Sequence, residues 1–169
     1  MKRALVIIDM QYGFVNDDTR GLVDKIEKYV KENTFDEIVC TAYENNENTA
    51  CYKFEGWKKC MTGSHEARVI KELQELSSKV FIKHKYSCWN EEFKQWVKDN
   101  KIDILYFVGV NTGCCVLHSA FDAYNDLQDC RVVEDLCKST SGAVSHNMAI
   151  SILKECITRE RVIRSGLCD

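Results

Sequence analysis

The sequence predicts an α/β fold, a three-layer α/β/α sandwich in which helices cover both faces of a central, mostly parallel sheet of five or six strands. Two observations lead to this prediction. Short runs of β-branched and apolar residues alternate with stretches of helical periodicity along the whole chain, a pattern typical of parallel strands joined by crossover helices. Uninterrupted apolar runs, such as residues 104–108, suit strands buried on both faces. At 169 residues the chain is expected to form one domain, over 1–169.

Five apolar runs are predicted to be strands, and a sixth short run near the C-terminus extends the pattern. The predicted strands cover residues 3–8, 37–41, 79–83, 104–110 and 131–133, with the sixth around 161–163. Each run is short and rich in valine, isoleucine or aromatic residues, which favours strand over helix.

Apolar residues spaced three or four positions apart predict the helices between these strands. The first three helices are marked by Val23, Ile26 and Val30, by Val69, Leu73 and Leu76, and by Phe93, Trp96 and Val97. Ser64 and Asn90 are placed to cap the second and third of them. Two later helices are expected at about 113–127, with Ala120, Ala123, Tyr124 and Leu127 facing inward, and at about 141–156.

One connection is much longer than the others. Residues 43–63 contain three asparagines and two glycines and show no strand pattern. Connections of this length in compact domains are commonly functional. The segment is therefore expected to be a lid or a binding loop.

Charge and hydropathy limit the classes of partner. The net charge is −3 with a pI near 5.8, and no basic block exceeds a Lys or Arg pair, so neither nucleic acid nor an anionic membrane is expected as a partner. The apolar run at the N-terminus ends at Asp9, far short of a signal peptide or a membrane span. The protein is expected to be cytoplasmic.

The chain has ten cysteines, but none forms a C-x-x-C pair. Zinc-ribbon and thioredoxin-like functions therefore lose their main sequence support. Because no export signal is evident, the cysteines are expected to be free thiols rather than a disulfide framework. A thiol-rich redox or metal-binding module remains as an alternative that rests on the cysteine count alone.

Three chemically capable side chains follow predicted strands. Asp9 follows the first strand, Lys83 closes the third, and Cys115 follows the fourth through a tight turn that opens a helix. Each residue alone has an ordinary structural explanation, as a cap, a solvated lysine or a buried thiol. In parallel sheets, however, ligands bind beyond the carboxyl ends of the strands, so the three are expected to converge. A cation and a helix N-terminus favour a thiolate, and a carboxylate can act as its base.

Three segments resemble the hallmark motifs of the isochorismatase-like cysteine hydrolases, a superfamily that includes the nicotinamidases. They read ALVIIDMQ at 4–11 with Phe14 after it, KHKYSCW at 83–89 and GVNTGCCV at 109–116. They occur in family order, so the resemblance covers essentially the whole chain. It implies an isochorismatase-like fold and a catalytic triad of Asp9, Lys83 and Cys115, with Cys115 rather than Cys114 as the nucleophile.

The resemblance further implies a cis peptide between Val110 and Asn111, with the backbone N–H groups of Asn111 and Cys115 forming an oxyanion hole. It implies attack by the Cys115 thiol on a small-molecule amide, departure of ammonia or an amine, and hydrolysis of a thioester. Lys83 would lower the pKa of the thiol. Phe14 matches an aromatic residue beside the substrate in the family.

Substrate-binding residues are expected among the aromatics near the same sheet edge and in the long connection. These are Phe14, Tyr43, Trp57 and Trp89. Core packing is the alternative role for each of them. An aromatic-lined cleft would favour a flat or apolar acyl group.

The chain departs from the nicotinamidase pattern at the metal site. Nicotinamidases carry an Asp-x-His element after the second strand, whereas residues 41–45 here read TAYEN, and His65 is the only histidine between the second and third strands. We therefore expect no metal and no cofactor. A metal-dependent nicotinamidase-type enzyme and a non-catalytic binding or regulatory member of the fold remain the alternatives. The resemblance also suggests a homodimer or homotetramer.

Overall fold

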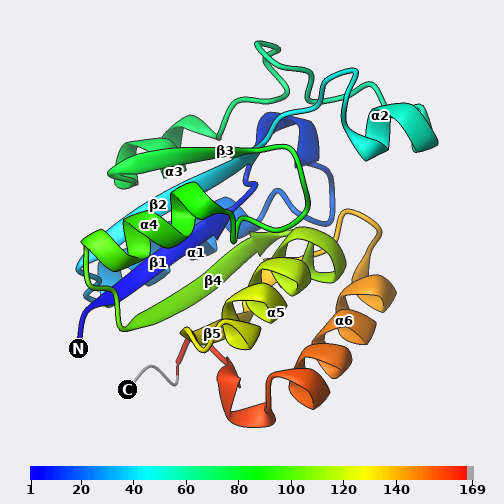
Figure 1. Ribbon diagram of the computed structural model, residues 1–169. Coiled ribbons are helices and arrows are strands. Elements are labelled where there is room, and N and C mark those ends of the chain that lie inside the picture. Colours follow the sequence, from blue (N-terminus) through cyan, green and yellow to red (C-terminus); the bar gives the residue numbers. More distant parts are fainter. Residues whose placement is uncertain (167–169) are drawn as a thin grey trace.

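The computed structural model describes residues 1–166 and confirms the α/β class (Figure 1). Six strands, all parallel, form one sheet in the order β3-β2-β1-β4-β5-β6. The strands are β1 (Arg3–Ile8), β2 (Glu37–Tyr43), β3 (Lys79–Lys83), β4 (Ile104–Val110), β5 (Asp129–Lys138) and β6 (Val162–Ile163). The helices are α1 (Leu22–Glu32), α2 (Ala50–Glu55), α3 (Lys71–Leu76), α4 (Glu91–Asp99), α5 (Leu117–Asn125) and α6 (Ala143–Cys156), with short helical turns η1 (Tyr12–Phe14), η2 (Thr112–Val116) and η3 (Arg159–Arg161).

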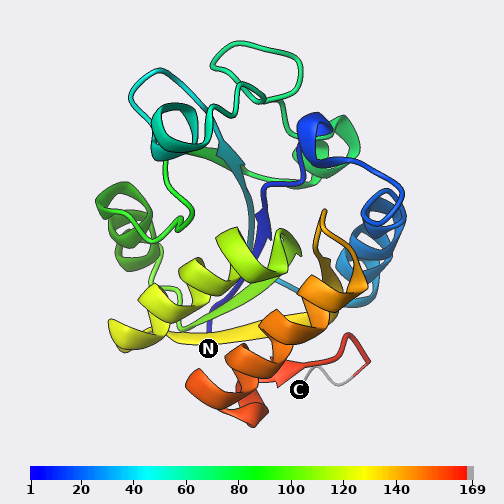
Figure 2. The ribbon, with the colours of Figure 1, turned by 90° about the vertical axis from the view of Figure 1, so that its right-hand side faces the viewer.

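The helices form two layers, one on each face of the sheet. Helices α4, α5 and α6 cover one face and α1 and α3 cover the other (Figures 1 and 2). Strand β4 is buried along its whole length, and β1 is buried from Ala4 onward. Successive side chains of a strand point to opposite faces, so Val6 and Phe107 enter one core and Leu5 and Tyr106 the other.

The strand order places a crevice at the centre of the sheet. After β1 the chain proceeds to β2 and β3 on one side, whereas β4, β5 and β6 lie on the other. The connections therefore diverge beyond the carboxyl ends of β1 and β4, which is where open α/β sheets bind ligands. Helix α2 and the loops around it lie beyond this end of the sheet (Figure 1).

The strands occur where the sequence predicts them. The observed β2 and β5 are longer than expected, because β2 stays paired with β3 as far as Tyr43 and β5 pairs with β4 again after an irregularity. Asn90 caps α4 as predicted, with its side-chain oxygen accepting a hydrogen bond from the Phe93 amide.

Two helix predictions are wrong in detail. Helix α3 begins only at Lys71, and Ser64 instead stabilises a turn by accepting a hydrogen bond from the Ala67 amide. Leu127, expected to face inward, is 94% exposed and has a positive φ of 63°. It lies beyond the end of α5, where the helical spacing no longer fixes the direction of a side chain.

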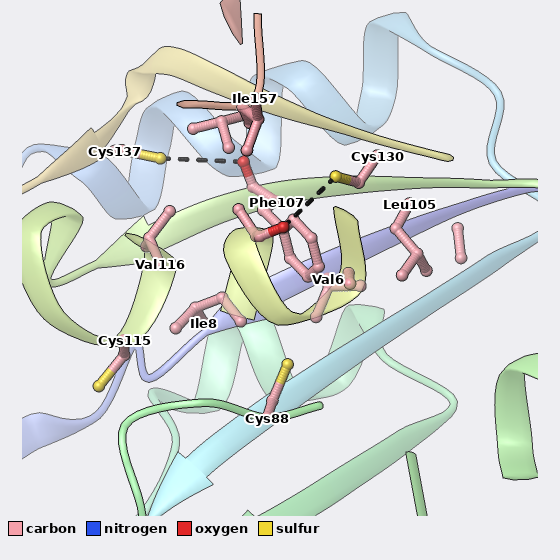
Figure 3. Close-up of a cluster of buried hydrophobic side chains, with 14 of the residues drawn as sticks. Val6, Ile8, Cys88, Leu105, Phe107, Cys115, Val116, Cys130, Cys137 and Ile157 are labelled. Atoms are coloured by element: carbon pink, nitrogen blue, oxygen red, sulfur yellow. Dashed lines mark hydrogen bonds between the residues drawn. The ribbon is translucent and has the colours of Figure 1, made fainter. Parts of the chain in front are cut away.

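The nine cysteines within residues 1–166 are free, as predicted, while Cys168 lies outside the described residues. Several thiols are ordinary core groups: Cys137 donates to the Phe107 carbonyl and Cys130 to the Ala120 carbonyl, both at 3.8 Å (Figure 3). Figure 3 shows Cys115 at the margin of this cluster, with its sulfur directed away from Val116. Between residues 1 and 166 there is no helix with the length and apolar character needed to span a membrane.

Candidate active site

Asp9 and Lys83 form a buried ion pair at the carboxyl ends of β1 and β3. The Asp9 Oδ2 and Lys83 Nζ atoms are 2.7 Å apart, and both side chains are almost completely shielded from solvent. The hydroxyl of Thr41, on the intervening strand β2, donates to Asp9 Oδ1 at 2.6 Å. Asp9 itself adopts a left-handed backbone conformation, with φ at 48°, directly after the strand. The chain therefore turns sharply here, and the carboxylate is held from two sides.

Lys83 is fixed by further contacts. Its ammonium group donates to the backbone carbonyls of Lys85 at 3.1 Å and Tyr86 at 2.9 Å. Burial alone would lower the pKa of Lys83, but the Asp9 carboxylate and then Cys115 outweigh this effect, and the pKa is raised above its usual value. Lys83 therefore stays protonated and serves as a fixed positive charge.

Cys115 lies in η2, the single turn of π-helix that follows β4 and leads into α5. Only 4% of its surface is exposed. Burial raises the pKa of the Cys115 thiol well above its ordinary value, the Asp9 carboxylate raises it further, and the Lys83 ammonium lowers it. Lys83 lowers the pKa of the thiol, as predicted. The net pKa is nevertheless raised, whereas the sequence had led us to expect a preformed thiolate. In the resting protein Cys115 is therefore a neutral thiol beside the Asp9 carboxyl group.

The peptide between Val110 and Asn111 is cis, as the resemblance implies. The Asn111 side chain accepts a hydrogen bond from the Thr140 amide at 2.6 Å, and the Thr140 carbonyl in turn accepts one from Asn16 at 2.9 Å. The loop after β5 is thereby tied to the segment that carries Asn111 and Cys115.

A cavity of about 330 Å³ opens directly onto Cys115. It is lined by aromatic, polar and thiol side chains: Phe14, Tyr43, Cys51, Glu55, Trp57, Tyr86, Asn111, Cys114, Cys115, Thr140 and Ser141. The rings of Phe14 and Trp57 lie almost parallel, at 9°, with centroids 6.0 Å apart. Of the four aromatics expected near the substrate, the structure brings Phe14, Tyr43 and Trp57 to this cavity.

Trp89 does not line the cavity. Its indole N–H donates to Asp126 at 2.7 Å and its ring packs against Phe93, with centroids 5.9 Å apart. The expectation that Trp89 lies beside the substrate is therefore wrong. Proximity to Lys83 in the sequence did not place it at the site, because the chain between them turns toward the start of α4.

The long connection forms one wall of the cavity and contains a helix, α2, that no periodic pattern had predicted. Thr49 caps α2 by accepting a hydrogen bond from the Tyr52 amide. The side chain of Asn45 donates to the carbonyls of Trp57 at 2.6 Å and Lys59 at 3.2 Å. Gln11 holds the start of the connection through both the amide and the carbonyl of Tyr43. These contacts order the segment against the sheet.

Sequence reasoning did not identify Tyr86, Glu55, Cys51 or Ser141 as cavity residues. Tyr86 lies within the motif that begins at Lys83, so its position three residues after a catalytic candidate was a usable signal. The others lie in loops or in the unpredicted helix α2, where no spacing pattern indicates which way a side chain points.

The described residues do not offer a ligand set for a metal ion. No cluster of three or more histidine, cysteine, aspartate or glutamate side chains with suitable geometry is found within residues 1–166. His65 is exposed, and its ring stacks on Tyr12 with centroids 4.3 Å apart. A nicotinamidase-type metal site therefore does not fit these side chains.

Comparison with known proteins identifies the family and agrees with the fold. The family model of the isochorismatase domain matches residues 3–161. An isochorismatase-like hydrolase from Alkaliphilus metalliredigens superposes with a TM-score of 0.84 at 20% identity, over 98% of this chain and 96% of that one. For the N-carbamoylsarcosine amidase of Thermoplasma acidophilum the TM-score is 0.81 at 23% identity, over 100% and 99% of the two chains. For the nicotinamidase of Bacillus subtilis it is 0.81 at 19% identity, over 97% and 100%. No curated protein sequence matches the chain.

Proposed function

Because the chain belongs to the isochorismatase family of hydrolases, we propose that it is a cysteine-dependent amidohydrolase that cleaves the carbon–nitrogen bond of a small-molecule amide through a thioester intermediate. The observation that supports this most strongly is the buried Asp9–Lys83 ion pair beside the Cys115 thiol, which itself lines a cavity of small-molecule size. A buried ion pair is costly to maintain for stability alone. Here it supplies a base and a fixed cation next to a nucleophile.

The proposed reaction begins with a neutral thiol. As the Cys115 sulfur attacks the amide carbonyl, Asp9 takes the thiol proton and then passes it to the departing nitrogen, which leaves as ammonia or an amine. The remaining thioester is hydrolysed by a water that gives a proton to Asp9. The carboxylic acid leaves, the proton returns to the Cys115 sulfur, and the starting state is restored.

Lys83 has an electrostatic role in this scheme. It stays protonated throughout and lowers the energy of the thiolate that develops during attack. The backbone N–H groups of Asn111 and Cys115 are the proposed donors to the oxyanion of the tetrahedral intermediate. Phe14, Tyr43 and Trp57 are proposed to contact the acyl group.

Release of ammonia from a panel of aryl and alkyl carboxamides, including nicotinamide and pyrazinamide, tests the proposal. Cys115→Ala should abolish release, whereas Cys114→Ala should retain it within about tenfold, because the neighbouring thiol lines the cavity without being the nucleophile. Cys156→Ala is the matched control, since Cys156 is an exposed thiol at the end of α6. Activity that survives in Cys115→Ala would overturn the mechanism.

The same panel distinguishes a metal-dependent enzyme from the proposed one. Dialysis against a chelator should leave ammonia release unchanged, and added zinc or iron should not raise it. If no amide is hydrolysed and Cys115 also fails to react with iodoacetamide, the chain is a non-catalytic member of the fold.

A further inference from the structure

We infer that the substrate of this site carries a positively charged group, such as a substituted ammonium, on the acyl side of its amide. This inference rests on the proposed function and names its substrate class. The cavity at Cys115 combines aromatic rings with one carboxylate, and no lysine, arginine or histidine is among the residues that line it in the described part of the chain. That combination favours a cation over a neutral or anionic ligand.

Four aromatic side chains line the cavity, Phe14, Tyr43, Trp57 and Tyr86, and we refer to them as the cage. Phe14 and Trp57 are nearly parallel, Trp57 is tilted at 50° to Tyr43, and the Tyr43 and Trp57 centroids are 6.0 Å apart. Lys83 Nζ already lies 5.4 Å from the centre of the Tyr43 ring. Because Lys83 already lies over the Tyr43 ring, we expect a cationic group of the substrate to contact mainly Phe14, Trp57 and Tyr86. The face of an aromatic ring attracts a cation through its quadrupole, and the attraction grows as the site loses water.

Glu55 supplies the charge of the cage. It lies at the end of α2, its carboxylate is 3.5 Å from the Tyr86 hydroxyl, and no salt bridge to Glu55 is found within residues 1–166. The charges of Asp9 and Lys83, which lie next to Cys115 but do not line the cavity, offset each other. The net charge presented by the cavity wall is therefore negative.

Among the residues that the structure describes, a neighbouring groove is lined by basic side chains instead of a carboxylate. This groove, of about 760 Å³, is lined by Lys53, His84 and Lys85 and shares Tyr43, Cys51 and Tyr86 with the cavity. An anionic ligand would find its partners there rather than next to Cys115. The groove does not open onto the nucleophile, because neither Cys115 nor Asn111 lines it. The reacting part of the substrate is therefore selected by the cage and Glu55.

Three primary amides of similar size test whether the site prefers a cationic, a neutral or an anionic substrate. They are trimethylammonioacetamide, its uncharged isostere 3,3-dimethylbutanamide (tert-butylacetamide), and the anion malonamate. We expect kcat/KM for the cationic amide to exceed that for the isostere by about tenfold or more, a difference of about 1.4 kcal/mol, and malonamate to be the poorest of the three. A positive charge also activates the carbonyl towards attack, whichever protein acts on it. The ratio of kcat/KM for the cationic amide to kcat/KM for its isostere is therefore compared between protein variants.

Glu55→Gln should lower this ratio by about threefold or more, because it removes the negative charge of the cavity wall. Glu47→Gln is the matched control, since Glu47 is an exposed residue of the same segment that does not line the cavity. A ratio that stays the same in Glu55→Gln, or a preference for malonamate, would overturn the inference.

A second readout does not require turnover. Each amide is tested for its ability to slow alkylation of Cys115 by iodoacetamide, followed by site-resolved mass spectrometry. The cationic amide should protect Cys115 at lower concentration than its isostere, and Glu55→Gln should reduce this difference. Protection of Cys115 without hydrolysis would support the cation site and contradict the amidohydrolase. Hydrolysis without a preference for the cationic amide would support the amidohydrolase and contradict the cation site.

Discussion

The carboxylate of Asp9 and the ammonium of Lys83 are 2.7 Å apart in a part of the protein where neither side chain reaches solvent. They come from opposite sides of β2, whose Thr41 hydroxyl lies between the two strands and bonds Asp9. Taking two charges out of water costs several kcal/mol per ion, and only their mutual attraction and additional hydrogen bonds offset this cost. Replacing one partner alone should therefore lower the free energy of unfolding far more than replacing both.

Lys83→Met should lower the free energy of unfolding by about 3 to 5 kcal/mol, because the buried Asp9 carboxyl group loses its cationic partner. The double variant Asp9→Asn/Lys83→Met should recover most of this loss. Urea denaturation of the two variants and the parent measures both values. A loss below about 1 kcal/mol in Lys83→Met would show that the pair is not buried as described.

Thr41→Val should reduce kcat by about tenfold with little change in KM, because it removes the 2.6 Å hydrogen bond that positions the Asp9 carboxylate. Thr41→Ser keeps the hydroxyl and should therefore have a kcat close to that of the parent protein. A purely structural role for Thr41 would lower thermal stability in both variants without separating their kcat values, so stability and steady-state kinetics are measured together.

Gly109→Ala should destabilise the protein by about 3 kcal/mol or more. Gly109 has a φ of 112°, and a Cβ atom there would lie 2.2 Å from the backbone oxygen of Ile8 on the adjacent strand. Gly21→Ala is the control, since its φ is −73° and nothing lies within 4 Å of the added Cβ. It should change stability by less than about 1 kcal/mol, as measured by chemical denaturation. Equal effects of the two substitutions would contradict the close approach of β1 and β4.

The sheet and the three central residues could be predicted from the sequence because each depends on a short-range pattern. Buried parallel strands are continuous apolar runs, and the residue that follows each run must lie at the same edge of the sheet. Asp9, Lys83 and Cys115 meet for this reason. The resemblance of their surroundings to a known family also supplied the choice of Cys115 over Cys114 and the cis peptide before Asn111.

The errors occur where long-range packing decides the outcome. Ser64 has the right side chain for a cap, but the chain after it first makes a turn, and α3 starts seven residues later, at Lys71. Trp89 is near Lys83 in sequence, yet its packing on Phe93 takes it away from the cavity. Glu55 could not be identified, because the orientation of α2 depends on the hydrogen bonds that Asn45 makes across the loop.

The net pKa of Cys115 also required the structure. From the sequence, a lysine and a helix start argued for a thiolate. The structure adds burial and the adjacent Asp9 carboxylate, which together outweigh Lys83 and keep the thiol protonated. The proposed mechanism consequently depends on Asp9 as a base for a neutral thiol.

The Asp9→Asn variant tests this dependence most directly, through two measurements on one protein: the pH dependence of Cys115 alkylation and the rate of ammonia release. Because the Asp9 carboxylate raises the pKa of the thiol, its neutralisation should shift the alkylation curve to lower pH. Amide hydrolysis should nevertheless fall by about 10² to 10⁴, because the base is gone. An alkylation curve that moves to higher pH, or hydrolysis that stays within about tenfold of the parent, would contradict the account.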